Sequence, residues 1–236
     1  MATSNVAQPL KKRYLLIDCL RGLAVLLMIV FHSVFDAGLF AIVNVPFLDS
    51  PYWIGFAKFI VSLFLLCVGM GLALVHKRAT RWDAVWKRFY TLGGWALAIT
   101  LVTYLLLPEH AIVFGALHCI AVTSAAGVLF VRRPRLALAL AGLIAASNLI
   151  FDPELLPLSD WLQVAPMDDV PFYPWFSVVL LGIYLESINV YKLPLKENGL
   201  TGSLAVLGRH SLKIYLIHQP ILVGICILIY KIRTGF

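Results

Sequence analysis

Long apolar runs separated by short polar segments dominate this sequence. Five of the seven runs hold nineteen residues or more, and a helix needs about 20 apolar residues to cross the hydrocarbon core of a bilayer. The pattern therefore predicts an all-α, polytopic transmembrane bundle of about seven helices. The two shortest runs are expected to tilt, to extend into flanking residues or to span only partly. The runs cover residues 14–34, 53–75, 89–107, 111–131, 136–151, 172–185 and 211–230.

The composition agrees with lipid as the solvent of most side chains. Hydrophobic residues make up 61% of the 236 residues and charged residues 13%, and the mean hydropathy is +0.90. Soluble domains hold roughly half apolar and a quarter charged residues. We expect one unit, 1–236, without a cleaved signal, because the first run contains Asp18 and Arg21 and lacks an A-x-A-like site. The four cysteines lie inside apolar runs without CxxC or metal-ligand spacing, which is typical of small buried residues.

The net charge of +7 is arranged as a membrane topology signal rather than as a nucleic-acid surface. Fifteen of the nineteen lysines and arginines fall on one side of the predicted membrane, and such residues are retained on the cytoplasmic side. The N-terminus, with a tail at 1–13, is therefore predicted to be cytoplasmic, and an odd number of spans puts the C-terminus outside. No nucleic-acid partner is expected.

The longest polar segment, 152–171, is predicted to be an outer loop rich in carboxylates and prolines. It is too polar to lie in lipid. It is long enough to cover a site, and it is equally typical of a solvated connector. Both interpretations stay open from the sequence alone.

The first run carries ionisable side chains, which are rare in spanning helices and usually functional. Arg21 and His32 are eleven positions apart, which puts them on one helix face, about 20° apart around the axis and roughly 16 Å apart along it. Asp18 can pair with Arg21. Asp36, four residues after His32, can orient the imidazole ring. The alternative is a structural Asp18–Arg21 ion pair and an interfacial histidine.

Two other runs also contain polar side chains. His118 lies near the middle of its run, where it is either functional or a neutral histidine bonded to another helix. In the last run Tyr215, His218 and Gln219 share a stripe at spacings of three and four. Arg209 and Lys213 precede or begin that helix; they either set its topology or meet the phosphates of a nucleotide-like donor. No three metal ligands occur at a recognisable local spacing, so no metal is expected.

Four segments in this order resemble bacterial members of the heparan-alpha-glucosaminide N-acetyltransferase catalytic-domain family. The likeness spans nearly the whole chain. The first segment is also similar to a pattern of the broader transmembrane acyltransferase superfamily, arginine and then histidine after ten residues, which here is Arg21 and His32. The segments are IDCLRGLAVLLMIVFHSVFD, IVFGALHCIAV, YPWFSVVLLGIYL and LGRHSLKIYLIHQPI.

The resemblance implies a single transmembrane acyltransferase-like domain, in a bacterial cytoplasmic (inner) membrane. It implies transfer of an acetyl or other acyl group from cytoplasmic acetyl-CoA to a saccharide or cell-envelope acceptor on the outer side. With this chemistry His32 is the leading general base, oriented by Asp36, and His118 is the second candidate. The residues expected to bind the substrate or the donor are Arg21, Arg209, Lys213, Tyr215, His218 and Gln219.

Two other classes of function remain open. A small proton-coupled transporter also uses intramembrane histidine, arginine and aspartate, but it need not bind a CoA thioester. A nonenzymatic assembly subunit would keep its function without His32 and His118. The acceptor and the oligomeric state, including a homo-oligomer, are not specified by the sequence.

Overall fold

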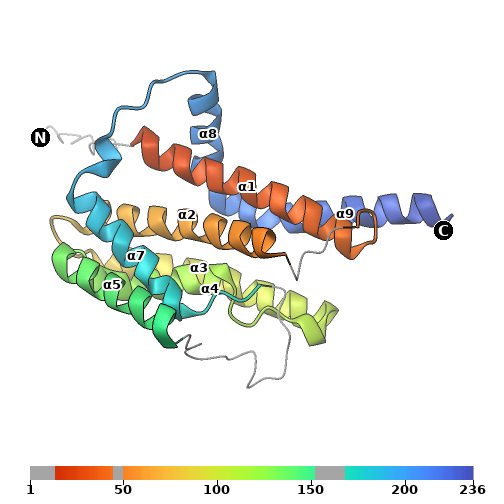
Figure 1. The fold of residues 1–236 in the computed structure, drawn as a ribbon, viewed down its shortest axis with the longest axis horizontal. Helices are drawn as coiled ribbons and strands as arrows, with labels where there is room; N and C mark the ends of the chain where they lie inside the picture. The colour runs from red at the N-terminus through yellow and green to blue at the C-terminus, as the bar shows by residue number, and fades with distance from the viewer. Residues whose placement is uncertain (1–13, 45–49, 152–167, 236) are drawn as a thin grey trace, which may run out of the picture.

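A computed structural model describes residues 14–44, 50–151 and 168–235, and within them every regular element is a helix (Figure 1). The predicted all-α class is thus confirmed. The eight α-helices are α1 (Leu15–Leu39), α2 (Pro51–His76), α3 (Trp82–Leu106), α4 (Ala116–Gly127), α5 (Pro134–Phe151), α7 (Phe172–Ser187), α8 (Gly199–Arg209) and α9 (Ser211–Thr234). Short 3-10 turns occupy η1 (Pro108–His110), η2 (Val128–Phe130) and η3 (Val190–Lys192).

Four of these helices, α1, α2, α3 and α9, are long and apolar enough to cross a membrane. Each has 24 to 26 residues, and about 20 suffice for the hydrocarbon core. The apolar helices α4, α5 and α7 are shorter. Together they make the chain a multi-pass helical membrane bundle, as predicted.

The run at 111–131, predicted to be one span, differs from that expectation. Its α-helix begins only at Ala116, because Gly115 before it has an extended backbone with φ −86° and ψ −173°. The helix then passes into η2 at Val128. A carboxylate oxygen of Asp168 accepts a hydrogen bond from the backbone N–H of Ala116 at 3.0 Å, which satisfies one free donor of the new helix end.

Helix α8 was not predicted, because it has only eleven residues and three of them are glycine, a poor helix former. A capping box begins it: the Asn198 side chain accepts from the Thr201 N–H, and the Thr201 hydroxyl accepts from the Asn198 N–H, each at 2.9 Å. Figure 1 shows α8 crossing α1 steeply. At the crossing a side chain on Gly208 would meet the backbone of Asp18, and one on Gly22 would meet the backbone of Leu204. Glycine is therefore what lets the two backbones approach.

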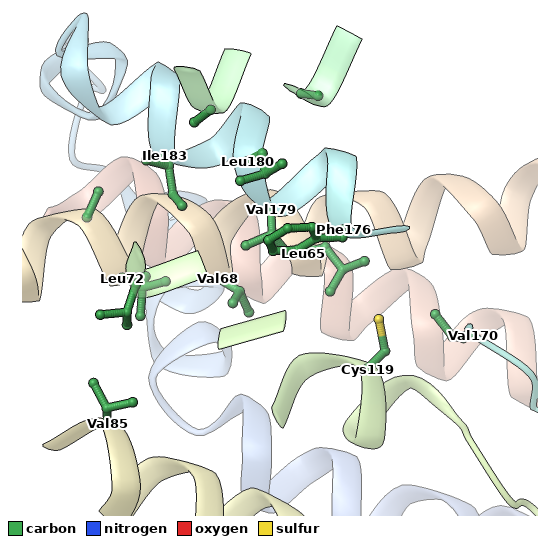
Figure 2. Close-up of a cluster of buried hydrophobic side chains, with 14 residues drawn as sticks. Leu65, Val68, Leu72, Val85, Cys119, Val170, Phe176, Val179, Leu180 and Ile183 are labelled. Carbon is green, nitrogen blue, oxygen red and sulfur yellow. The ribbon is translucent and has the colours of Figure 1, made fainter. Parts of the chain in front are cut away.

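The main hydrophobic core lies between α2, α4, α5 and α7 (Figure 2). Leu65 of α2 packs there with Leu180 and Ile183 of α7. Gly69 and Gly182 allow this pair of helices to touch, since a side chain on either would strike the backbone of the other helix. By contrast, α3 and α9 expose many large apolar side chains, which is what lipid-facing helices require.

One ion pair joins the end of α2 to the last turn of α7. Lys77 Nζ lies 2.8 Å from Glu186 Oε1, and the carboxylate side chain is only 5% exposed. The hydrogen bond to Glu186 raises the pKa of the Lys77 ammonium. Sequence reasoning did not foresee the pair, since its members are 109 positions apart.

Removing one partner of this pair is predicted to destabilise the bundle. Lys77→Met should lower the free energy of unfolding by about 2 kcal/mol, because a buried carboxylate loses its cation. The loss is smaller than for a fully buried pair, because Lys77 is half exposed. The double variant Lys77→Met/Glu186→Gln should recover most of that loss. Thermal unfolding in detergent measures both, and equal melting temperatures for the single variant and the wild type would contradict the prediction.

Candidate functional site

A cavity of about 480 Å³ lies among α1, α2, α3, α4 and α9. It follows α2 from Val61 to His76, a length of roughly 22 Å at 1.5 Å per residue. Most of its wall is apolar, with leucine, valine and phenylalanine side chains. Its polar lining consists of Arg21, His76, Lys87, Arg88, Thr91, Ser211 and Tyr215. A volume of this size is typical of small-molecule sites.

Arg21 enters the cavity from α1 instead of pairing with Asp18. Its Nη2 donates to the backbone carbonyl of Cys67 at 3.4 Å, and within the described residues the ion pairs are Lys77–Glu186 and Arg81–Asp83. Gly71 makes room for the guanidinium, because a Cβ there would lie 2.8 Å from Arg21 Nη2. The structural Asp18–Arg21 pair considered from the sequence is therefore not formed.

The other cations of the cavity come from α3, not from the start of α9. All four residues are exposed, but Lys87 and Arg88 line the cavity, whereas Arg209 and Lys213 do not. Sequence reasoning assigned Lys87 and Arg88 to topology alone. The signal that was overlooked is their place in the first two turns of a helix that continues as an apolar span, where exposed cations can also line a cavity of the bundle. Of the described residues that line the cavity, none is a carboxylate, so it suits an anionic group.

A second polar region brings together His32 and Asp36 of α1 with His218 and Gln219 of α9. The rings of His32 and His218 lie 5.0 Å apart. Gln219 Nε2 donates to Asp36 Oδ1 at 2.9 Å. Asp36 is completely buried and His218 is 8% exposed. We call these four residues the histidine cluster.

Each member of the histidine cluster has a buried polar atom without a hydrogen-bond partner. These atoms are His32 Nδ1, Asp36 Oδ2, His218 Nε2 and Gln219 Oε1. Buried polar atoms are nearly always hydrogen-bonded, so four free ones in one place indicate a site prepared for a ligand. Asp36 was expected to orient the imidazole of His32. Its bonded oxygen accepts from Gln219 instead, and His32 Nδ1 has no partner, so Asp36 does not orient His32 through that nitrogen.

Tyr215 connects the cavity to the histidine cluster. It lines the cavity, and its ring lies 5.6 Å from the ring of His218. Its backbone carbonyl lies 2.7 Å from His218 Nδ1. A molecule that fills the cavity up to Tyr215 therefore ends beside an imidazole of the cluster.

His118 lies in a different network, on the side of α3. The Thr100 hydroxyl donates to the Ile112 carbonyl at 2.7 Å, so its oxygen accepts the hydrogen bond from His118 Nε2 at 3.3 Å. The ring also stacks on Phe114, with centroids 5.7 Å apart. These contacts match the interpretation of a neutral histidine bonded to another helix, and they join α4 to α3.

The proposed outer loop lies mostly outside the described residues, which resume at Asp168. Asp168 caps α4 as described above, and desolvation raises the pKa of its carboxyl group. Val170 N–H then donates to the Phe114 carbonyl at 3.0 Å. Both interpretations of 152–171, a cover over a site and a solvated connector, stay predictions. Among the residues that the structure describes, no group of three histidine, cysteine or acidic side chains is arranged to hold a metal ion.

Comparison with known proteins agrees with the resemblance seen in the sequence. The family model described as heparan-alpha-glucosaminide N-acetyltransferase, catalytic, matches residues 13–220. The match covers α1 to α8 and the part of α9 that carries His218 and Gln219. Searches of curated proteins and of solved structures give no match. The chain therefore belongs to the heparan-alpha-glucosaminide N-acetyltransferase catalytic-domain family, and it is a multi-pass membrane member of this acetyltransferase family.

Proposed function

We propose that this protein transfers an acetyl group from acetyl-CoA, bound from the cytoplasmic side, to a saccharide or cell-envelope acceptor on the outer side of a bacterial inner membrane. The observation that carries the proposal is the cavity, which is lined by the cations Arg21, Lys87 and Arg88 and also by Tyr215, whose ring lies beside His218 of the histidine cluster. Membership of the acetyltransferase family supports the chemistry. The predicted cytoplasmic N-terminus supports the direction, since the basic loops share its side.

The donor would enter at Arg21, Lys87 and Arg88. CoA carries phosphate groups, and arginine and lysine are the side chains that bind phosphate. The apolar middle of the cavity suits the pantetheine arm, so that the thioester reaches Tyr215. Arg209 and Lys213, which sequence reasoning placed at the donor, have no contact with this path and are not retained in the proposal.

The acceptor would bind at the histidine cluster. Its four unpaired polar atoms can hold hydroxyl or amine hydrogens of a saccharide. An imidazole there can take the proton that the acceptor loses on acetylation, which is general base catalysis. His118 is not retained as the base, because it neither lines the cavity nor contacts a member of the histidine cluster among the described residues.

Acetyl-CoA binding to purified protein in detergent tests the donor site. Wild-type protein should bind saturably in calorimetry, and Lys87→Ala/Arg88→Ala should weaken binding by roughly ten- to a hundredfold, as expected for losing hydrogen bonds to charged phosphates. The matched control is Arg132→Ala/Arg133→Ala, which removes two adjacent exposed cations that do not line the cavity. Its affinity should equal that of the wild type.

Three outcomes would count against the proposal in different ways. Equal loss in both double variants would indicate a nonspecific charge effect. Loss in Arg209→Ala/Lys213→Ala but not in Lys87→Ala/Arg88→Ala would move the donor to the start of α9. No binding by well-folded wild-type protein would favour the proton-coupled carrier, whose relay the histidine cluster can equally supply.

A further inference from the structure

The hydrogen bonds of His218 determine which of its nitrogens carries a proton. Its Nδ1 lies 2.7 Å from the Tyr215 carbonyl oxygen. A carbonyl oxygen only accepts hydrogen bonds, so Nδ1 is the donor and carries the hydrogen. In the neutral ring Nε2 is then unprotonated, and it is a buried atom without a partner. His218 therefore presents a free basic lone pair inside the bundle.

His32 lacks this preparation. Its Nδ1 has no partner, and among the described residues no hydrogen bond fixes its tautomer. The residue as a whole is more exposed than His218, and its ring lies beside aromatic neighbours, with its centroid 5.4 Å from that of Phe31. A base that is held in one tautomer by a backbone carbonyl keeps its lone pair available, whereas an unfixed ring divides its population between two forms.

The remaining groups around His218 complement a base. His32 and Tyr215 flank its ring, at centroid distances of 5.0 Å and 5.6 Å. Asp36, which is completely buried, joins the same cluster through its hydrogen bond from Gln219. The unpaired oxygens of Asp36 and Gln219 accept hydrogens only, so they can orient the other donor groups of an acceptor.

We infer that His218 Nε2, rather than His32, is the general base for the acetyl transfer, and that the Tyr215 carbonyl is its positioning group. The inference rests on the proposed function. The acceptor oxygen or nitrogen attacks the thioester carbon while its proton passes to Nε2. The new bond forms, the carbon–sulfur bond breaks with its electron pair on sulfur, and the leaving CoA thiolate takes the proton back from Nε2. The products are acetylated acceptor and CoA thiol, and the histidine returns to its starting form.

The test combines a tautomer measurement with turnover. In protein labelled with ¹⁵N in its histidine rings, the His218 signals are those that disappear in His218→Gln. At pH 7.5 they should report a hydrogen on Nδ1 and none on Nε2. CoA release from acetyl-CoA is measured with D-glucosamine as probe acceptor and with water alone. His218→Gln should lower it at least about a hundredfold, while acetyl-CoA affinity stays within twofold of the wild type. His32→Gln should lower it less.

Each contrary result has a definite meaning. A proton on Nε2, or turnover by His218→Gln within threefold of the wild type, overturns the assignment of the base. A larger loss of turnover in His32→Gln than in His218→Gln also overturns it. Intact acetyl-CoA binding in His218→Gln shows that the variant is folded. Wild-type protein that neither binds acetyl-CoA nor releases CoA overturns the proposed function, and the tautomer measurement stands apart from that failure.

Discussion

Gly208→Ala is expected to destabilise the protein by about 3 kcal/mol or more, although it adds one methyl group. A Cβ at this position would overlap the backbone of Asp18 on α1, and a backbone cannot move aside as a flexible side chain can. The two helices would have to separate along their whole crossing. For a chain of this size the loss corresponds to a fall in Tm of roughly 6–12 °C. Differential scanning fluorimetry in detergent measures it.

Gly202→Ala is the matched control for this variant. Gly202 lies in the same helix, and a Cβ there would have nothing within 4 Å. Because alanine is the better helix former, this change should be neutral or stabilising by up to about 1 kcal/mol. If Gly208→Ala melts at the same temperature as Gly202→Ala, the close approach of α1 and α8 is wrong.

Asp36→Asn is expected to separate stability from activity. Asparagine keeps an oxygen that can accept from Gln219, but it removes a negative charge that is completely buried. Burial of a charge is costly, so the variant should be as stable as the wild type or more stable. The same charge favours a protonated imidazole in the cluster. Asp36 reaches His218 only through the adjacent Gln219, so CoA release should fall roughly tenfold, which corresponds to about 1.4 kcal/mol on the barrier.

The control for Asp36→Asn is Asp18→Asn, which removes a carboxylate from the other end of α1. Asp18 does not contact the histidine cluster, so turnover should be unchanged. Activity in Asp36→Asn equal to that of the wild type would show that the buried charge has no part in the reaction. A large loss of stability would show instead that contacts in the folded protein stabilise the buried carboxylate.

The helices that are long enough to span the membrane were predictable from the sequence. The four long spans follow directly from uninterrupted apolar runs, because a bilayer requires about 20 such residues in succession. Helix α8 was missed because it is short and rich in glycine, and because its close approach to α1 at Gly22 and Gly208 joins distant parts of the chain. The run at 111–131 was taken as one span because hydropathy does not register that Gly115 and the distant Asp168 begin a new helix at Ala116.

In the candidate site, most polar residues were predictable from the sequence, but their partners were not. His32, Asp36, His218 and Gln219 were all nominated from the sequence, since polar residues in apolar helices stand out. Their partners were not predictable: Asp36 was assigned to His32 by its spacing of four, but it bonds to Gln219 across 183 positions. Lys87 and Arg88 were overlooked because a basic helix start looks the same whether it faces water or a cavity.

The long separation between partners also affects how the protein is made. Cys19 Sγ donates to the carbonyl of Thr201, 182 positions later in the chain. At roughly 5–20 residues per second, α1 leaves the ribosome about 10–35 s before the segment that covers it has been synthesised. During that interval Gly22 lacks its native neighbour Leu204, and Asp36 lacks its native partner Gln219. Helix α1 is thus inserted early, but its packing against α8 and α9 is among the last events of synthesis. A chain interrupted before Gly199 forms neither the α1–α8 crossing nor the histidine cluster.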